Sequence, residues 1–399
     1  MQANTKEDFY SLVTRVEASF ESKFKRPARW IAAAPGRVNL IGEHTDYNGG
    51  FVFPMAIERS TVLAADEREG ATGGNVEITI HSENLGDTQT LKILDNTIEK
   101  TGDWADYIAG IFVGFLNLGI QFKSIDIALA SDVPIGGGLS SSAALEVSVA
   151  TLLEAVTGKT LSPIEKVLLC QKAEHEFPGV PCGIMDQFVS VNGKKNHLLL
   201  LDCNSQQAEE VPFTSDEYSI LIINSNVKHS LTSGEYSKRR AECEIAAEIL
   251  NVDTLRQASM VQLEESASKM DPIVFRRARH VIGEIERTKQ TALAMKAGDW
   301  ATVGELMLAS HNSLRDDYEV SCKELDVLVE LMMELGGSKG VVGTRMTGGG
   351  FGGCTVSVVP TRKVDDLIAG VSQRYIEKIG IEPDIFTTRP AEGTQMIKL

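Results

Sequence analysis

The spacing of apolar and polar residues changes several times along the chain and predicts a succession of different elements. Apolar residues at helical spacing within residues 1–26 predict an amphipathic first helix: Phe9, Leu12, Val13, Val16 and Phe20. A short strand is expected at 29–34. Alternating runs rich in β-branched residues predict further strands at 51–55, 61–65, 76–81 and 90–94. This alternation favours a sheet with one face open to solvent.

The middle of the chain alternates between helical and strand patterns. Helical spacing is found at 104–118, from the end of the 134–144 segment to 155, at 163–177 and at 183–191, and strands are expected at 125–130, 198–201 and 220–223. Ser162 stands where it would cap the helix that begins at Pro163.

The last third has a different character. From residue 234 to 336 the chain is rich in Ala, Glu, Leu and Arg at 3.6-residue periodicity, with interruptions near Asp271-Pro272 and Gly298. A glycine-rich stretch flanked by strands is expected at 341–360, then a helix at 364–378 and a strand at 384–388. This order of elements predicts an α+β protein of two domains, 1–205 and 206–399, with a cleft between them.

Composition narrows the function classes. With 399 residues, 43% hydrophobic and 24% charged, the chain has ample material for globular domains. Its formal net charge of -16 argues against a nucleic-acid or anionic-membrane surface, although a local nest of backbone N–H groups can still bind phosphate. The N-terminus has no apolar segment typical of a signal peptide, and no run of apolar residues is long enough to span a membrane.

The cysteines indicate a reduced compartment. They stand at 170, 182, 203, 243, 322 and 354, with no C-x-x-C pair and no histidine at zinc-ligand spacing. We therefore expect free thiols in a cytoplasmic protein without a zinc site.

The segment from Pro134 to Ala144 is the first candidate for chemistry. Three glycines, 136–138, and then Leu139 precede three serines, Ser140, Ser141 and Ser142, between a predicted strand and a predicted helix. Glycines let the backbone approach an anion, the helix N-terminus supplies free N–H groups, and serines add hydroxyls and a magnesium ligand. A turn with a serine cap would explain one glycine and one serine only. No Walker A string occurs, so the pattern predicts a phosphate loop of another kind.

A second glycine-rich segment, 348–353, formally matches Gly-x-Gly-x-x-Gly. A dinucleotide-binding fingerprint must open a helix, whereas this one is followed by the strand-like run Cys354–Val359. The oxidoreductase interpretation therefore fails. A plain loop and a connection close to a substrate both remain open.

Ionisable residues crowd the segment after Pro35. Gly36 and Arg37 are followed closely by Glu43, His44 and Asp46 in a turn-rich stretch. This is either a solvated polar loop or a site at which carboxylates and a histidine bind several hydroxyls while the arginine faces phosphate.

Two further carboxylates are candidates on their helices. Asp186 lies early in a mostly apolar helix, where an aspartate usually serves as a cap or dipole partner but could also accept a proton from a substrate hydroxyl. Glu174, on the preceding helix, would pass as a surface charge by itself.

Three of these segments together resemble a known family. Residues 36–50, Gly-Arg-Val-Asn-Leu-Ile-Gly-Glu-His-Thr-Asp-Tyr-Asn-Gly-Gly, are similar to the signature of galactokinases. Residues 134–144 resemble the ATP-phosphate loop of the GHMP kinases, and residues 343–353 resemble the third motif of that superfamily. The motifs occur in the family's order, and the likeness extends over nearly the whole chain.

The resemblance implies a fold and a set of roles. It implies two α/β domains with nucleotide and sugar meeting between them, ATP and Mg²⁺ as cofactors, and galactose as the partner molecule. We expect a monomer. Asp186 would be the base, and Arg37 would stabilise both it and the transferring phosphoryl group. The remaining roles are sugar binding by Glu43, His44, Thr45, Asp46, Gly183 and Tyr236, triphosphate binding by Gly136, Gly137, Gly138, Leu139, Ser140, Ser141 and Ser142, and magnesium binding by Ser142 and Glu174.

Two alternatives stay open beside a galactokinase. A related sugar-1-kinase would act on N-acetylgalactosamine or arabinose and would differ around the 2-hydroxyl. A non-catalytic galactose and ATP sensor can lack a Ser-Ala step in the phosphate loop, whereas Ser142-Ala143 is present here together with Arg37 and Asp186. Protein-kinase chemistry finds no support, because neither His-Arg-Asp nor Asp-Phe-Gly occurs.

Overall fold

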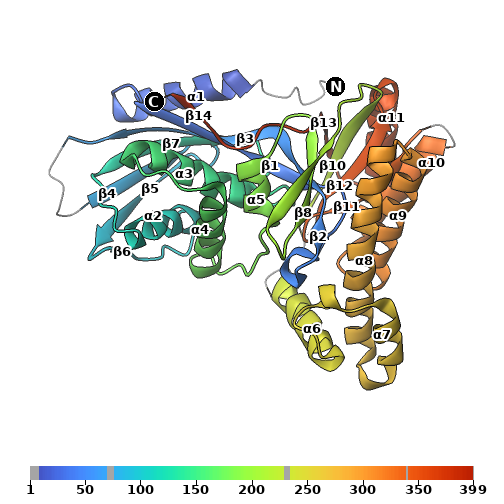
Figure 1. Ribbon diagram of the computed structural model, residues 1–399. Coiled ribbons are helices and arrows are strands. Elements are labelled where there is room, and N and C mark those ends of the chain that lie inside the picture. The colour runs from blue at the N-terminus through green and yellow to red at the C-terminus, as the bar shows by residue number, and fades with distance from the viewer. Residues whose placement is uncertain (1–8, 70–75, 229–233, 338–339, 399) are drawn as a thin grey trace.

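The computed structural model describes residues 9–69, 76–228, 234–337 and 340–398. The first eight residues of the predicted N-terminal segment lie outside this range. Among the described residues, none of the helices is both long and apolar enough to cross a lipid bilayer. The α+β fold class expected from the sequence is confirmed, with sheets in both halves of the chain and helices packed on them (Figure 1).

The first sheet has seven strands in the order β14-β1-β3-β7-β4-β5-β6. Its neighbours are antiparallel except for β4 and β7. The strands are β1 (Trp30–Asn39), β3 (Pro54–Glu67), β4 (Val76–Ser82), β5 (Asp87–Leu94), β6 (Thr97–Ile98), β7 (Ile125–Ser131) and β14 (Gln395–Lys398).

Helices cover both faces of this sheet at its centre. The predicted apolar stripe of α1 (Phe9–Phe24) packs on β3 and β7 from one side. Helices α2 (Asp106–Asn117) and α3 (Ser141–Thr157) pack on the other, with α4 (Pro163–Glu176) and α5 (Met185–Asn192) beside them. The expectation of an open face was therefore wrong for β3, in which residues 61–65 are all buried, and held only for the alternating strands β4 and β5.

The second half is built on an antiparallel sheet of order β11-β12-β10-β13. Its strands are β10 (Tyr218–Lys228), β11 (Gly343–Thr347), β12 (Gly352–Pro360) and β13 (Asp384–Thr388). Helices α9 (Trp300–Asp316), α10 (Lys323–Gly336) and α11 (Val364–Ile379) pack beside it. A small sheet of β2 (Phe51–Val52), β8 (His197–Asp202) and β9 (Gln207–Pro212) lies between the two halves in Figure 1.

The predicted helical stretch consists of α6 (Glu235–Leu250), α7 (Met260–Glu265), α8 (Pro272–Ala297), α9 and α10. Both predicted interruptions are helix boundaries. The side chain of Asp271 caps α8 by accepting from the backbone N–H of Ile273, and Gly298 ends the helix in a left-handed conformation. Ser162 likewise caps α4 through a capping box with Glu165, as expected.

Some strands were missed or shortened by the sequence reasoning. Strand β1 does not stop at Pro35-Gly36 but continues to Asn39 across a register shift between Pro35 and Arg37. Strands β6, β9 and β14 were not expected, and β14 brings the C-terminal end back to pair with β1. The division of the chain at residue 205 stays a prediction.

Candidate active site

The centre of the site is an ion pair between Arg37 and Asp186. The β1 bulge region presents Arg37, and the first turn of α5 presents Asp186. Nε and Nη2 of Arg37 donate to the two carboxylate oxygens of Asp186, each at 2.7 Å, and Nη1 donates to the carbonyl of Gly138 at 2.6 Å. Burial lowers the pKa of the Arg37 guanidinium, but the charges of Asp186 and Glu43 outweigh it and leave that pKa raised.

The predicted phosphate loop opens α3 beside this pair. Gly136 and Gly138 have φ of 70° and 73°, and Ser140, the residue before the helix, is left-handed at 58°. The hydroxyl of Ser140 donates to Asp186. A left-handed conformation is costly for most side chains, and glycine, which adopts it freely, occupies two of these three positions.

The loop borders a cavity of about 490 Å³. Gly136, Gly138 and the three serines line this cavity, as expected of a phosphate loop. Gly137 and Leu139 do not. Leu139 is fully buried in the core, and its carbonyl accepts the backbone N–H of Arg37 at 3.0 Å.

The second glycine-rich segment packs directly against the phosphate loop. It connects β11 and β12, two strands, as its context predicted. A Cβ at Gly348 would lie 2.8 Å from the carbonyl oxygen of Gly138, so the two loops touch through backbone alone. Gly349 lines the cavity of the phosphate loop and also a second cavity on the other side of Asp186. Of the two interpretations left open, the connection close to a substrate is therefore favoured.

The far end of the 490 Å³ cavity was not found from the sequence. It is walled by apolar and amide side chains from separate elements: Asn84, Leu85, Trp104, Tyr107 and Ile135. This composition suits a flat aromatic base next to a phosphate site. The available signal was Ile135, an apolar residue directly before the glycines, whose side chain is 57% exposed.

The second cavity, of about 140 Å³, gathers most of the residues expected to bind sugar. Those lining it are Arg37, Glu43, His44, Asp46, Gly183, Asp186 and Tyr236, with Gly349. Gly183 fits only because it has no side chain, since a Cβ there would fall 1.8 Å from Oδ2 of Asp46. Burial and the neighbouring charge of Asp186 raise the pKa of Asp46 to about 7.

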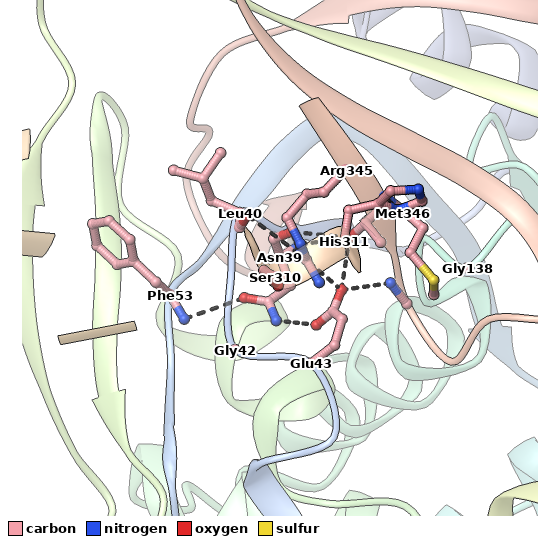
Figure 2. Close-up of polar contacts among 12 residues, drawn as sticks. Asn39, Leu40, Gly42, Glu43, Phe53, Gly138, Ser310, His311, Arg345 and Met346 are labelled. Atoms are coloured by element: carbon pink, nitrogen blue, oxygen red, sulfur yellow. Dashed lines mark hydrogen bonds and ion pairs between the residues drawn. The ribbon is translucent and has the colours of Figure 1, made fainter. Parts of the chain in front are cut away.

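Glu43 lies inside a polar cluster between the signature segment and the third motif (Figure 2). Its carboxylate accepts from the side-chain amide of Asn39, from the Thr347 hydroxyl at 3.0 Å and from the backbone N–H of Gly348 at 2.6 Å. The fully buried guanidinium of Arg345 lies 3.5 Å away. The carboxylate thus joins the signature segment to the third motif at the wall of the second cavity.

Thr45, also expected to contact sugar, does not line the cavity. Its side chain is fully buried, and its hydroxyl bonds to the carbonyls of Gly42 at 2.9 Å and Phe51 at 2.6 Å. These contacts shape the turn that carries His44 and Asp46. A role in sugar binding for Thr45 stays a prediction.

The expected magnesium ligands, Ser142 and Glu174, are brought together by α3 and α4. The Ser142 hydroxyl hydrogen-bonds the Glu174 carboxylate, which is 5% exposed and also accepts from Gln187 at 2.5 Å. Burial and the charge of Asp186 raise the pKa of Glu174. Gln187 donates in turn to Glu146, a second buried carboxylate that the sequence reasoning missed.

A hydroxyl and a carboxylate next to a phosphate site fit Mg²⁺, which takes one or two protein oxygens and completes its shell with phosphate and water. Within the described ranges, no three of the His, Cys, Asp and Glu side chains are grouped as a self-contained metal site. The Ser142 hydroxyl and the Glu174 carboxylate therefore suit a cation that takes its other ligands from phosphate and water.

The fold and the site together define a small-molecule kinase of the GHMP type. Family models match the chain in three stretches: the galactokinase galactose-binding signature at 18–67, the GHMP kinases N terminal domain at 106–194 and the GHMP kinases C terminal domain at 291–377. Galactokinase from Homo sapiens is 41% identical over 97% of both chains, and that from Bos taurus is 42% identical over 94% of this chain and 95% of its own. The crystal structure of Lactococcus lactis galactokinase complexed with galactose superposes with a TM-score of 0.90 at 34% identity, covering 97% of this chain and 100% of that one. The chain belongs to the galactokinase family.

Proposed function

We propose that this protein transfers the γ-phosphoryl group of ATP to the anomeric 1-hydroxyl of α-D-galactose, giving α-D-galactose 1-phosphate and ADP. The observation that carries the proposal is the meeting of the two cavities. Arg37, Asp186 and Gly349 line both of them, so a phosphate held in one cavity and a hydroxyl held in the other would face each other across the same ion pair. Phosphoryl transfer depends chiefly on such alignment and on neutralising charge.

Asp186 takes the proton of the attacking hydroxyl in this proposal. The anomeric hydroxyl is a comparatively acidic alcohol, so one positioned carboxylate suffices as its base or as the group that orients it. Arg37 holds that carboxylate in place through two hydrogen bonds and lies where its charge can stabilise the transferring phosphoryl oxygens.

The sugar occupies the smaller cavity in this proposal. Asp46 and Glu43 accept hydrogen bonds from the sugar hydroxyls, and His44, the backbone at Gly183 and Tyr236 complete the wall. The 136–142 loop binds the triphosphate of ATP, and the apolar end of the larger cavity takes its base.

Ser142 and Glu174 would hold the magnesium ion that accompanies ATP. When bound, the cation neutralises charge on the phosphate oxygens. The polar contact between the two residues supports this part of the proposal, as does their placement, since Ser142 lines the larger cavity and Glu174 the smaller one.

The remaining expectations concern the setting of the enzyme. We propose a cytoplasmic monomer without a nucleic-acid or membrane partner, in keeping with the net charge of -16 and with six free cysteines. A kinase for N-acetylgalactosamine or arabinose is the nearest alternative, and a non-catalytic sensor is the more remote one.

A coupled assay of ADP release across a panel of sugars tests the proposal. We expect galactose to give the highest kcat/KM, with N-acetylgalactosamine and arabinose well below it. A higher kcat/KM for N-acetylgalactosamine would identify that sugar as the substrate in place of galactose. The absence of galactose-dependent ADP release would favour a non-catalytic sensor.

A further inference from the structure

A chain of hydrogen bonds runs from the helical region to the point where the two cavities meet. Sγ of Cys243 lies 3.2 Å from the hydroxyl of Tyr318, which lies 2.8 Å from the hydroxyl of Tyr47. The Tyr47 hydroxyl lies 2.8 Å from Nδ1 of His44, and Nε2 of His44 lies 3.2 Å from the carbonyl oxygen of Gly349. Of the five residues in this chain of hydrogen bonds, only His44 and Gly349 line the second cavity.

The donors in this chain can be assigned from one end. The Gly349 carbonyl can only accept, so Nε2 of His44 carries a hydrogen. The ring is neutral, because burial and the positive charge that His280 can carry together lower the pKa of His44 to about 3. Nδ1 is therefore bare and accepts from Tyr47.

The remaining donors follow in order. The hydroxyl of Tyr47 donates its one hydrogen to His44, so its oxygen accepts a hydrogen bond from the hydroxyl of Tyr318. The oxygen of Tyr318 then accepts from the thiol of Cys243. His44, Tyr47 and Tyr318 each donate one hydrogen bond and accept one, Cys243 donates at one end, Gly349 accepts at the other, and all hydrogens point towards Gly349.

The packing around the chain leaves its members little freedom. Tyr318 is fully buried, and its ring packs against the rings of His44 and His280, with centroid distances of 4.7 Å and 4.6 Å. Cys243 is buried on α6, two helical turns after Tyr236, so one face of that helix carries both the end of the chain and a wall of the sugar cavity.

We infer that Tyr47 and Tyr318 are positioning residues that hold the His44 ring in a single tautomer, with its Nε2–H on the Gly349 carbonyl, and thereby fix the segment between the sugar and the phosphate. The inference deepens the proposed function, on which its kinetic consequences rest. Neither tyrosine lines either cavity. Tyr318 lies after α9, far along the chain from the signature segment that it orders.

The test compares Tyr318→Phe with Tyr375→Phe. Both tyrosines are fully buried and each uses its hydroxyl in hydrogen bonding, but that of Tyr375 donates to the backbone carbonyl of Ser225 at 3.0 Å, outside both cavities. Tyr318→Phe is expected to raise the galactose KM about fivefold, the effect of one hydrogen bond, with kcat changed less. Tyr375→Phe should lower the free energy of unfolding by a similar amount and leave the galactose KM unchanged. Equal KM values for the two variants would overturn the inference.

A double variant shows whether Tyr47 and Tyr318 act through one chain of hydrogen bonds or through two unrelated structural defects. Tyr47→Phe removes the donor to His44, so adding Tyr318→Phe should raise KM no further. Independent structural defects would multiply their effects, and that outcome contradicts the inference. If Tyr318→Phe does not fold, Cys243→Ala and Cys243→Ser replace it, with KM raised only in the alanine variant, which lacks a donor.

Nitrogen NMR of the histidines tests the tautomer without any turnover. In the unaltered protein Nδ1 of His44 should show the shift of a bare ring nitrogen, and Tyr47→Phe should move it towards a tautomer mixture. A mixture already present in the unaltered protein would overturn the inference whatever the sugar specificity. A single tautomer in a protein that does not phosphorylate galactose would instead uphold the chain and refute the proposed function.

Discussion

Arg37 binds both carboxylate oxygens of Asp186, each through one N–H at 2.7 Å, although the two residues are 149 positions apart in the sequence. This fork fixes the plane of the carboxylate, and the Ser140 hydroxyl bonds one of its oxygens as well. The side chain of Asp186 remains 22% exposed, towards the cavities, while that of Arg37 is 6% exposed. The acidic partner can therefore meet a substrate while the basic partner stays behind it.

Replacing Asp186 with Asn should abolish most turnover and spare sugar binding. Asn keeps the shape but cannot take a proton, so kcat should fall by about 10² to 10⁴. The dissociation constant for galactose, measured by calorimetry, should change little. Asp126→Asn is the matched control, since Asp126 is a buried aspartate paired with Arg26 and Arg68 outside both cavities. A kcat close to that of the unaltered protein in Asp186→Asn would refute the role of base.

Gly183→Ala should damage sugar binding selectively. The new methyl group would collide with the Asp46 carboxylate, 1.8 Å from Oδ2, and push it out of place. The galactose KM should rise by about tenfold or more, with the ATP KM unchanged. Gly179→Ala serves as the control, because it introduces backbone strain at φ 79° in the same connection with no atom within 4 Å. If both variants behave alike, the contact with Asp46 has no role in binding.

Gly348→Ala should weaken ATP binding by displacing the phosphate loop. Its Cβ would lie 2.8 Å from the Gly138 carbonyl, at a backbone φ of 83°. Gly380→Ala has nearly the same φ, 81°, and no neighbour within 4 Å, so it measures the strain alone, about 1–2 kcal/mol. We expect the ATP KM to rise about tenfold in the first variant only. Steady-state kinetics at saturating galactose would show this, and an unchanged ATP KM would contradict it.

Asp46→Asn should stabilise the sugar-free protein increasingly as the pH rises. The pKa of Asp46 is raised from 3.8 to about 7 in the folded state, so the folded protein binds this proton more tightly than the unfolded chain does. Wild-type stability is therefore lost relative to the Asn variant between pH 4 and pH 7, and the difference is constant above that. At about 1.4 kcal/mol for each unit, the gain should reach roughly 2–4 kcal/mol.

Urea unfolding of the Asp46→Asn variant and wild type at pH 4.0, 5.5 and 7.5 checks this expectation. A difference that does not vary with pH would show that the carboxyl titrates normally. Galactose should reverse the order of stability at neutral pH, because the variant binds it more weakly.

Local patterns were sufficient for the elements whose signals lie close together in the chain. The stripe of Leu12, Val13, Val16 and Phe20, the cap at Ser162 and the stops at Asp271 and Gly298 all depend on contacts within a few residues. Strand β14 could not be found this way, since four residues carry little periodicity and their partner, β1, lies more than 350 positions earlier. The covered face of the first sheet was missed for the same reason, because α1 reaches it from outside the run of strands.

The site divides in the same manner. Arg37, Asp46 and the phosphate loop could be found from the sequence, because their local combinations of residues are unusual. The family resemblance predicts that they belong to one site. Trp104 and Tyr318 have no such signal, because a lone aromatic residue in sequence is most often core. The roles of these two residues can be inferred only from the side chains that the fold places next to them.

The most direct test of the account is the identity of the product. Phosphorus and proton NMR of the purified protein with ATP, Mg²⁺ and galactose should show one sugar phosphate, with phosphorus coupled to the anomeric proton of an α-galactoside, formed in step with ADP. A phosphate on any other hydroxyl, or ADP formed without a sugar phosphate, would contradict the assignment of Asp186 as the group that faces the 1-hydroxyl.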